Sequence, residues 1–341
     1  MKIIVIGSFQ FPIYAPAIAS GFSKLGNEVT IVNEDDFMYN NSIVGNLFNI
    51  IHTHYHLGLN VSLFNKRVIS EVINRKPNMV FIYRSYDVWP STIKKIKKEG
   101  AIVFTYNNDD PFSKILNNWS HRYYHASIPL AHVNFVYRPK NISDFKNAGA
   151  DKVELLLPYY LEKDNYYIDA SDTIPIAFIG HYEDDGRDKY VKALIDAGLP
   201  ISVYSNDWKK SLIYSQIKSA FKPSVYSSDY TLTLNQCQIA LVFLSKLNSD
   251  TYTRRNFEIP ATKTLMLSEY SEDLDKLFPE NKCAVYFRSI EDLVQKCKYL
   301  LENPSKIKFI AENGYKRIKE IGGTEVDRCR QILEVYNSLI V

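Results

Sequence analysis

The feature that most constrains the fold is an alternation of short apolar runs with helical segments, which occurs twice along the chain. In the first half, the β-branched runs that indicate strands are 2–6, 29–33, 79–83, 101–106, 133–137 and 153–157. The segments with helical periodicity between them are 16–25, 66–74, 91–99 and 142–148. Because parallel strands need long, usually helical crossovers, this alternation predicts an α/β domain with a parallel sheet.

The same alternation restarts after a polar, aperiodic segment at 163–173, which is a candidate linker. The runs expected as strands are 176–179, 201–204, 239–243, 264–267 and 284–287, and the expected helices are 187–197, 290–301, 305–321 and 325–339. A chain of 341 residues is also too long for one ordinary core. The sequence therefore predicts two domains, at 1–162 and 174–322, followed by a terminal helical segment at 323–341. Ligands are expected at the loops that follow the strands.

Composition and cysteine usage indicate a globular protein in a reducing compartment. Apolar residues make up 46% of the chain and charged residues 23%, a balance typical of globular proteins. The four cysteines (Cys237, Cys283, Cys297, Cys329) lack metal or redox spacing and are expected as free thiols. The first seven residues read as a buried strand rather than a signal peptide, and no apolar run is long enough to cross a bilayer. We expect a cytoplasmic protein.

The charge is uneven along the chain. Residues 1–160 hold 17 Lys and Arg against 12 Asp and Glu, whereas the remainder holds 24 against 26. A basic first half would favour contact with an anionic membrane or a lipid-pyrophosphate acceptor. The cluster Lys94-Lys95-Ile96-Lys97-Lys98 suits such a contact, but it equally fits the solvated face of an amphipathic helix. No nucleic-acid partner is expected.

The loop after the first strand indicates a substrate-facing backbone. Gly7 has no Cβ, so a substrate can approach the chain at Gly7-Ser8-Phe9. We assign Arg84, directly after the run 79–83, to the same acceptor cleft. The Gly-x-Gly-x-x-Gly fingerprint of dinucleotide-binding enzymes is absent, which argues against a dehydrogenase or epimerase.

The second half contains a motif suited to a nucleotide sugar, Arg254-Arg255-Asn256-Phe257-Glu258-Ile259-Pro260-Ala261, upstream of an apolar run. The carboxylate of Glu258 can accept hydrogen bonds from two neighbouring hydroxyls, and guanidiniums can hold a pyrophosphate. Capping of a helix start is the structural alternative for Glu258.

This motif resembles the ribose-binding signature of glycosyltransferases with the GT-B fold. With it, an ordered set of segments is similar to the CgeB-like group, namely 177–187, 203–208, 230–243, 255–261, 304–317 and the acidic loop 107–112. Two positions depart from the pattern. Lys263 stands where the family often has Gly, and Asp250 replaces the first acid of the Glu-x7-Glu pattern of retaining enzymes.

The resemblance implies two Rossmann-like domains facing across a cleft, with an acceptor domain at 1–162, a donor domain at 174–322 and a last helix that packs back on the first domain. The activity implied is metal-independent transfer of a sugar, without a cofactor, from a nucleotide-sugar donor to a hydroxyl of a glycan or lipid-linked acceptor in bacterial surface polysaccharide synthesis. The candidate donor-binding residues are Gly180, His181, Arg187, Trp208, Tyr230, Arg254, Arg255 and Glu258. For Trp208 and Tyr230, core packing is the alternative to contact with the base.

Asp109 and Asp110 are the candidates for a catalytic base, because they follow the strand 101–106 where an inverting transferase would hold one. The Asp-Asp-Pro sequence also fits a simple turn. If neither is a base, retention is the expected stereochemistry.

The histidines offer weaker hypotheses. His52, His54 and His56 would share a face on a strand, which suggests metal binding, but no acid or Cys lies near them in sequence, and a polar loop fits as well. His121, His125 and His132 are candidates for the acceptor side. Two further functions remain open, a GT-B-like nucleotide-sugar epimerase and a non-catalytic sugar-binding protein.

Overall fold

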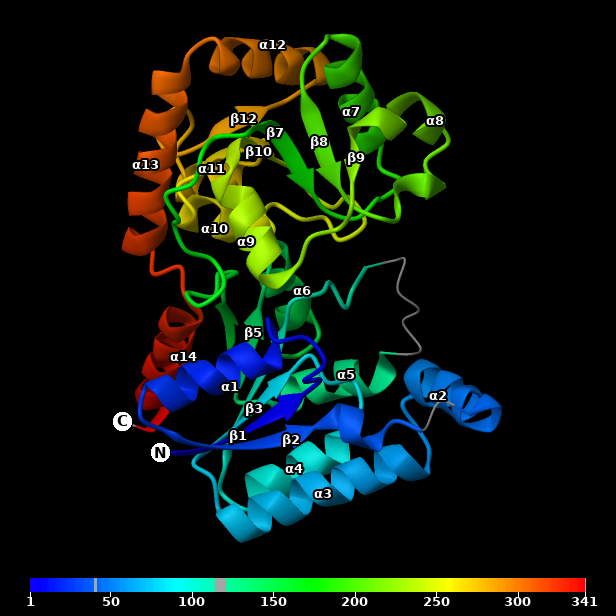
Figure 1. Cartoon of the computed structure of the whole chain (residues 1–341). Coiled ribbons are helices and arrows are strands. Elements are labelled where there is room, and N and C mark those ends of the chain that lie inside the picture. The colour runs from blue at the N-terminus through cyan, green and yellow to red at the C-terminus, as the bar shows by residue number, and fades with distance from the viewer. Residues whose placement is uncertain (40–41, 114–120, 341) are drawn as a thin grey trace. The chain divides into compact units, whose positions relative to one another are not determined.

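The computed structural model describes residues 1–39, 42–113 and 121–340, which form two compact units. Unit 1 contains the chain up to Leu157 together with the terminal helix α14 (Glu325–Ile340), and unit 2 spans Pro158–Thr324. Each unit is built on one six-stranded sheet in which all strands run parallel, with helices against the sheet (Figure 1). The predicted α/β class with two parallel sheets is confirmed.

Unit 1 has the strand order β2-β1-β3-β4-β5-β6. Its strands are β1 (Lys2–Gly7), β2 (Glu28–Asn33), β3 (Met79–Tyr83), β4 (Ile102–Asn107), β5 (Val133–Val136) and β6 (Val153–Leu155). Its further helices are α1 (Ala15–Lys24), η1 (Glu34–Phe37), α2 (Ile43–Tyr55), α3 (Leu59–Arg75), α4 (Pro90–Lys98), α5 (Arg122–Ser127), η2 (Ile128–Leu130) and α6 (Pro139–Asn147). The central strand β3 is buried along its whole length, as expected for a strand covered on both faces.

Unit 2 has the strand order β12-β11-β10-β7-β8-β9. Its strands are β7 (Ile174–Ile179), β8 (Ile201–Tyr204), β9 (Phe221–Lys222), β10 (Cys237–Val242), β11 (Leu265–Glu269) and β12 (Val285–Phe287). Its helices are α7 (Arg187–Asp196), η3 (Trp208–Lys210), α8 (Tyr214–Ile217), η4 (Lys218–Ala220), α9 (Ser227–Asn235), α10 (Arg255–Ala261), α11 (Glu272–Leu277), α12 (Ile290–Leu301) and α13 (Pro304–Glu320).

Strand order places a topological switch point in each sheet. In unit 1 the chain moves from β1 to β2 on one side and then crosses to β3 on the other side of β1. In unit 2 it runs from β7 through β8 and β9 and then crosses to β10, on the other side of β7. At such points the loops after neighbouring strands leave in opposite directions and open a crevice at the carboxyl edge of the sheet, where ligands of open α/β sheets bind. The loops that follow β1, β3, β7 and β10 are therefore the places to look for a site.

The terminal helix α14 packs against α1 within unit 1 (Figure 1). Gly21 of α1 permits this contact, because a Cβ at Gly21 would lie 2.6 Å from the sulfur of Cys329. The Sγ of Cys329 in turn donates to the carbonyl of Ile18 at 3.3 Å. At the end of α1, Lys24 pairs with the buried Glu325 at 2.6 Å. A small residue and one ion pair thus fix the chain's last helix to its first.

Several local expectations can be compared with the structure. Residues 52–55 lie in helix α2 and His56 caps it, so the strand or loop expected for the three histidines is wrong. The segment 163–173 contains no helix or strand and belongs to unit 2. All four cysteines are buried as free thiols. Within the described ranges, none of the helices combines the length and the apolar character that crossing a membrane requires.

Candidate functional site

Four of the predicted donor-binding residues come together where α9 and α10 begin. Glu258 on α10 accepts a hydrogen bond from the hydroxyl of Tyr230 on α9 at 2.7 Å. Arg254, four residues earlier, donates to the other carboxylate oxygen of Glu258. Arg255 donates to the Tyr230 oxygen at 3.3 Å, with its guanidinium carbon 5.5 Å from the centre of the Tyr230 ring. The motif therefore forms one cluster of a carboxylate, a phenol and two guanidiniums.

The electrostatics of this cluster keep Glu258 ionised. Burial, which leaves Glu258 only 3% exposed, acts to raise its pKa. The charges of Arg254 and Arg255 and the hydrogen bond from Tyr230 outweigh burial, so the pKa of Glu258 lies below its ordinary value. Burial and the neighbouring carboxylate raise the pKa of the Tyr230 phenol, which therefore remains a donor. An ionised carboxylate has about four lone-pair sites. Tyr230 and Arg254 use two of them, so two have no partner among the described residues.

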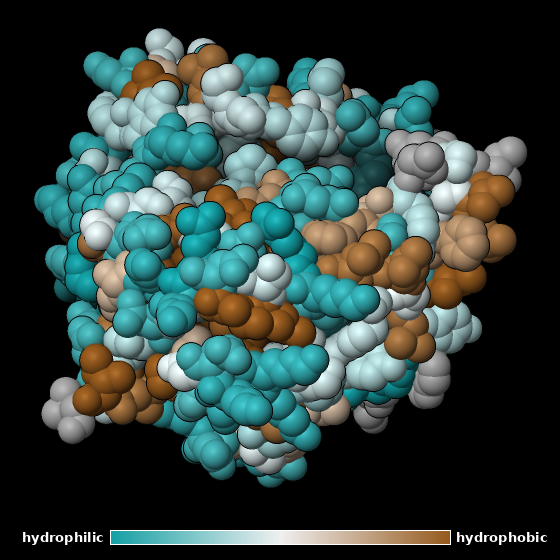
Figure 2. All heavy atoms as spheres, turned by 90° about the horizontal axis from the view of Figure 1, so that it is seen from below, coloured by the Kyte–Doolittle hydropathy of each residue, from teal (hydrophilic) through white to brown (hydrophobic). Residues whose placement is uncertain are grey.

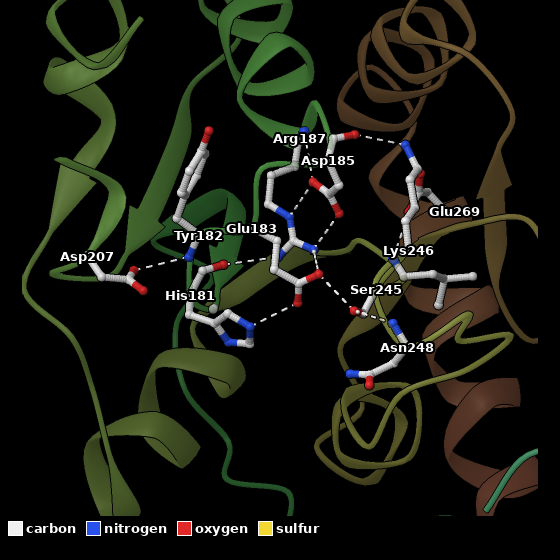
Figure 3. A network of polar contacts seen from close by, with 12 residues as sticks. His181, Tyr182, Glu183, Asp185, Arg187, Asp207, Ser245, Lys246, Asn248 and Glu269 are labelled. Atoms are coloured by element: carbon white, nitrogen blue, oxygen red, sulfur yellow. Dashed lines mark hydrogen bonds and ion pairs between the residues drawn. The ribbon is translucent and has the colours of Figure 1, made fainter. Parts of the chain in front are cut away.

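A second polar network lies after β7 and β10, at the switch point of unit 2 (Figure 3). Arg187, at the start of α7, makes two hydrogen bonds to Asp185, at 2.9 and 2.7 Å, and one to the carbonyl of His181 at 3.0 Å. It also pairs with Glu183 at 3.2 Å. The hydroxyl of Ser245 joins the two loops by donating to Glu183 at 2.7 Å. Arg187 is 4% exposed, so its charge is already balanced inside the protein.

The other predicted residues of this loop have different surroundings. His181 is largely exposed and contacts Glu183 through Nε2 at 2.9 Å. Trp208 is buried in the core of unit 2, where its Nε1 donates to the carbonyl of Gly180 at 3.0 Å. Lys246, which sequence reasoning missed, is exposed and donates to the Asp185 carbonyl at 2.9 Å. Its position three residues beyond the run 239–243 could have indicated it, because that run was already expected as a strand.

Lys263 retains the turn that a glycine would make. Its φ of 56° lies in the left-handed region, so the chain turns after α10 as in the pattern with Gly. The Nζ of Lys263 pairs with Glu312 at 3.1 Å and lies over the rings of Tyr167 and Tyr315. Lys263 precedes β11 and so lies at the amino edge of the sheet, away from the loops that follow the strands.

In unit 1, Asp109 and Asp110 have distinct environments. Asp109 is partly exposed and pairs with Arg84 at 3.0 Å, which brings two of the predicted residues together. Asp110 is 1% exposed and accepts from Lys140, Asn141 and the amide of Phe112. Burial acts to raise the pKa of Asp110, but these three donors hold it below its ordinary value. Asp110 is thus a fully bonded carboxylate that anchors its own loop.

The loop after β1 is held by Asp35, a residue that the sequence reasoning did not single out. One carboxylate oxygen of Asp35 accepts from the hydroxyl of Ser8 at 2.9 Å and from the amides of Phe9 and Gln10 at 2.7 and 3.0 Å. Gly7 precedes this loop with a φ of 155°, and a Cβ there would lie 2.6 Å from the Tyr83 carbonyl. The missing side chain of Gly7 is therefore required by the neighbouring strand β3.

The histidines of α2 contact a carboxylate rather than form a row. His52 and His56 lie one turn apart and contact the two oxygens of Asp87, each at 2.7 Å. His54, between them, is exposed. Asp87 lies more than thirty positions away in sequence, after β3, so proximity along the chain could not reveal it. Among the other histidines, His121 and His125 contact Tyr86 and Phe112, whereas His132 accepts from the amide of Val103.

Comparisons with known proteins agree with this architecture. Residues 187–334 match the family described as glycosyl transferase-like. No curated protein matches the sequence significantly. A crystal structure of HepE from Anabaena in complex with UDP-glucose is similar over 99% of this chain and 100% of its own, with a TM-score of 0.68 and 12% identity. The fold is that of GT-B glycosyltransferases.

Two further solved structures span the whole chain. Sucrose-phosphate synthase from Thermosynechococcus elongatus is similar over 100% of this chain and 99% of its own, with a TM-score of 0.69 and 10% identity. A structure titled putative UDP-N-acetylglucosamine 2-epimerase from Listeria monocytogenes is similar over 99% of this chain and 96% of its own, with a TM-score of 0.59 and 10% identity. At these identities the likeness concerns the fold. The family match supports a glycosyltransferase.

Proposed function

We propose that this protein transfers a sugar from a nucleotide-sugar donor bound by unit 2 to a hydroxyl of a glycan acceptor. The observation that carries this proposal is the ionised, buried carboxylate of Glu258, which retains two lone-pair sites beside two guanidiniums. Such a carboxylate suits the two adjacent hydroxyls of a ribose. Neighbours bound to UDP and UDP-glucose make a uridine donor the first choice for this chain.

For the diphosphate, we propose that side chains rather than a metal ion neutralise its charge. Arg254 and Arg255 lie beside Glu258, and Lys246 is exposed after β10. Arg187 is less suited than these three, because its guanidinium already serves two buried carboxylates. A donor aimed at developing charge contributes about 3 kcal/mol to the transition state in comparable sites. Transfer is expected to persist in EDTA.

The catalytic assignments of Asp109 and Asp110 remain predictions. Of the two, the contacts favour Asp109, because Asp110 is bonded through both oxygens. The membership of the CgeB-like group, the hexosyl class of the donor sugar and a role in surface polysaccharide synthesis also remain proposals that rest on the sequence resemblance.

We further propose that unit 1 contacts an anionic membrane from the inner side of the cell. The surface that supports this lies on α2 and the start of α3, where large apolar side chains are exposed together (Figure 2). They are Val44, Leu47, Phe48, Ile50, Ile51, Tyr55, Leu57, Leu59 and Leu63. Residues 42–76 also carry four Lys and Arg against one Glu, and that Glu71 is paired with Arg67 and Arg75. Exposed apolar area beside unbalanced cations fits anionic lipid headgroups.

The experiment that tests the transferase proposal is product analysis with UDP-glucose as donor, with and without a panel of methyl glycosides. A transferase yields a disaccharide only when a glycoside is present. The epimerase alternative predicts conversion of the donor alone into an isomeric nucleotide sugar, and the non-catalytic alternative predicts binding of UDP without any turnover. A thermal-shift comparison of UDP, GDP, dTDP and CMP identifies the nucleotide, because a ligand at a hundredfold its Kd adds about 2.7 kcal/mol of stability.

A further inference from the structure

Unit 1 contains a pocket of about 700 Å³ at the carboxyl edge of its sheet, beside the switch point at β1. Its walls are the loop after β1, the segment from the end of β2 through η1, one face of α2 and the loop after β3. A volume of this size suits one or two sugar rings. The pocket is formed entirely by residues of unit 1, and none of the residues predicted from sequence as a catalytic base lines it.

His56 lies in the wall of this pocket with a fixed orientation. Its Nδ1 contacts one oxygen of Asp87, while Nε2 of His52 contacts the other. Trp89 donates to the His56 carbonyl at 3.1 Å and so fixes the backbone at the end of α2. The Nε2 atom of His56 has no hydrogen-bond partner among the described residues.

The state of Asp87 determines which nitrogen of His56 carries the proton. Burial acts to raise the pKa of Asp87, but the two histidine hydrogen bonds outweigh it and hold this pKa below its ordinary value. An ionised carboxylate only accepts hydrogen bonds, so both imidazoles donate to it. Neutral His56 is therefore protonated on Nδ1, and its Nε2 has a free lone pair.

We propose that this pocket binds the acceptor as an uncharged, hydroxyl-rich sugar and that Nε2 of His56 takes the proton of the reacting hydroxyl. This inference rests on the proposed transferase function and names its acceptor class and its base, with His56 in place of Asp109 or Asp110.

The chemistry of the walls selects that class of acceptor. The polar residues Gln10, Asn33, Asn49 and Thr53 line the pocket together with aromatic residues, among them Tyr86. This mixture matches the hydroxyl-rich edges and C–H faces of a sugar ring. The described residues of the walls include three carboxyl groups and no Lys or Arg. A phosphate or uronic acid would therefore be placed beside Asp35 and Asp87 with no Lys or Arg among the lining residues, which is unfavourable.

Glu34 is a largely uncharged member of these walls. Burial, together with the charges of Asp87 and Asp35, raises the pKa of Glu34 to about 8 against the opposing effects of Ser85 and Arg84. Its Oε2 atom is buried without a hydrogen-bond partner among the described residues. At neutral pH the group is mostly a carboxylic acid, so it adds little negative charge to these walls.

The step that follows conserves charge and electrons. The acceptor oxygen forms a bond to the anomeric carbon while the bond from that carbon to the diphosphate oxygen breaks. The hydroxyl proton passes to Nε2 of His56, and the electron pair of the broken bond leaves with the nucleoside diphosphate. The imidazolium is stabilised by Asp87, and it later returns its proton to water. Because a base assists direct attack, the anomeric carbon is inverted, so α-linked UDP-glucose gives a β-glucoside.

The test separates acceptor binding from proton transfer. Saturation-transfer NMR with the uncharged methyl glycosides of glucose, galactose, mannose and N-acetylglucosamine measures binding, with methyl glucuronide and glucose 6-phosphate as anionic counterparts. We expect saturation of at least one uncharged glycoside, no saturation of the anionic ligands and loss of the signal in Thr53→Trp, which fills the pocket from α2. The variant His56→Gln should retain the NMR signal and UDP affinity but lose at least 100-fold in kcat, the contribution of a general base. The matched control is His54→Gln on the exposed side of the same helix, which should behave as wild type.

Each outcome decides a different claim. Absence of UDP binding contradicts the proposed function but does not affect the NMR result for unit 1. If UDP binds, the inference is overturned by saturation of the anionic ligands equal to that of the uncharged ones, or by absence of any uncharged signal. The assignment of His56 is overturned if His56→Gln does not reduce the rate of transfer, or if the product retains the α configuration.

Discussion

Replacing Glu34 by Gln tests the claim that this carboxyl is uncharged in the folded protein. The raised pKa, about 8 instead of 4.5, arises mainly from burial and from two neighbouring carboxylates. Between these two pH values the folded chain retains a proton that the unfolded chain has released. The free energy of unfolding of unit 1 therefore falls as pH rises from 4.5 to 8 and receives no further contribution from Glu34 above that.

The magnitude follows from the interval between the two pKa values. At 1.36 kcal/mol per pH unit, an interval from 4.5 to about 8 corresponds to at most about 5 kcal/mol. Water that enters with the charged group reduces this value, so we expect about 2–5 kcal/mol. Gln has the shape of the protonated acid without its titration. Glu34→Gln should thus match wild type near pH 4.5 and become more stable than wild type by this amount at pH 8 and above.

The assay must report on unit 1 alone, because the chain contains two units. Urea-dependent hydrogen exchange of the β1 and β3 amides, measured from pH 5 to pH 9, provides this. Glu28→Gln, at the exposed start of β2, is the control and should show no such pH trend. A stability difference between Glu34→Gln and wild type that stays constant over this pH range would show that Glu34 is ionised in the folded protein and would refute the reasoning.

Three other substitutions test separate parts of the structure. Arg187→Met leaves two buried carboxylates without their cation and should destabilise unit 2 by about 3–5 kcal/mol, whereas Arg288→Met, in an exposed ion pair, should cost less than about 1 kcal/mol. Equal losses of stability in urea unfolding would contradict the buried role of Arg187. Gly7→Ala should lower the melting temperature more than Gly26→Ala, since both positions have positive φ but only Gly7 lacks space for a Cβ. A larger loss of melting temperature in Gly26→Ala would be incompatible with the packing of Gly7 on β3. Leu47→Ser should reduce flotation with phosphatidylglycerol vesicles and leave UDP affinity unchanged, and undiminished flotation would argue against α2 as the contact.

The strands other than β9 and most of the longer helices could be predicted because their signals are local. β3 at Met79–Tyr83 and β8 at Ile201–Tyr204 have the predicted bounds, since β-branched and aromatic runs there end at polar or turn residues. Helix α2 was missed because its end, with three histidines at alternate positions, has the period of a strand.

The candidate site was predictable where neighbours in sequence act together and not where distant residues meet. Arg254 and Glu258 lie one helical turn apart, so the motif contained their contact. The pairing of Arg187 with Glu183 and Asp185 was also local, but the sequence alone does not show that burial commits the guanidinium to them. His56 and Asp87 are joined only when α2 packs beside the loop after β3. Their chemistry therefore required the tertiary structure.

The central claim is that Glu258 holds the ribose diol of the donor nucleotide, and a double-mutant cycle by calorimetry tests it most directly. UDP and its 2′,3′-dideoxy analogue are titrated into wild type and Glu258→Gln, with Glu272→Gln as a control at the exposed start of α11. We predict that removal of the carboxylate weakens UDP at least tenfold, about 1.4 kcal/mol, and weakens the analogue much less. Equal losses for the two ligands, or unchanged affinity for UDP, would contradict the assignment.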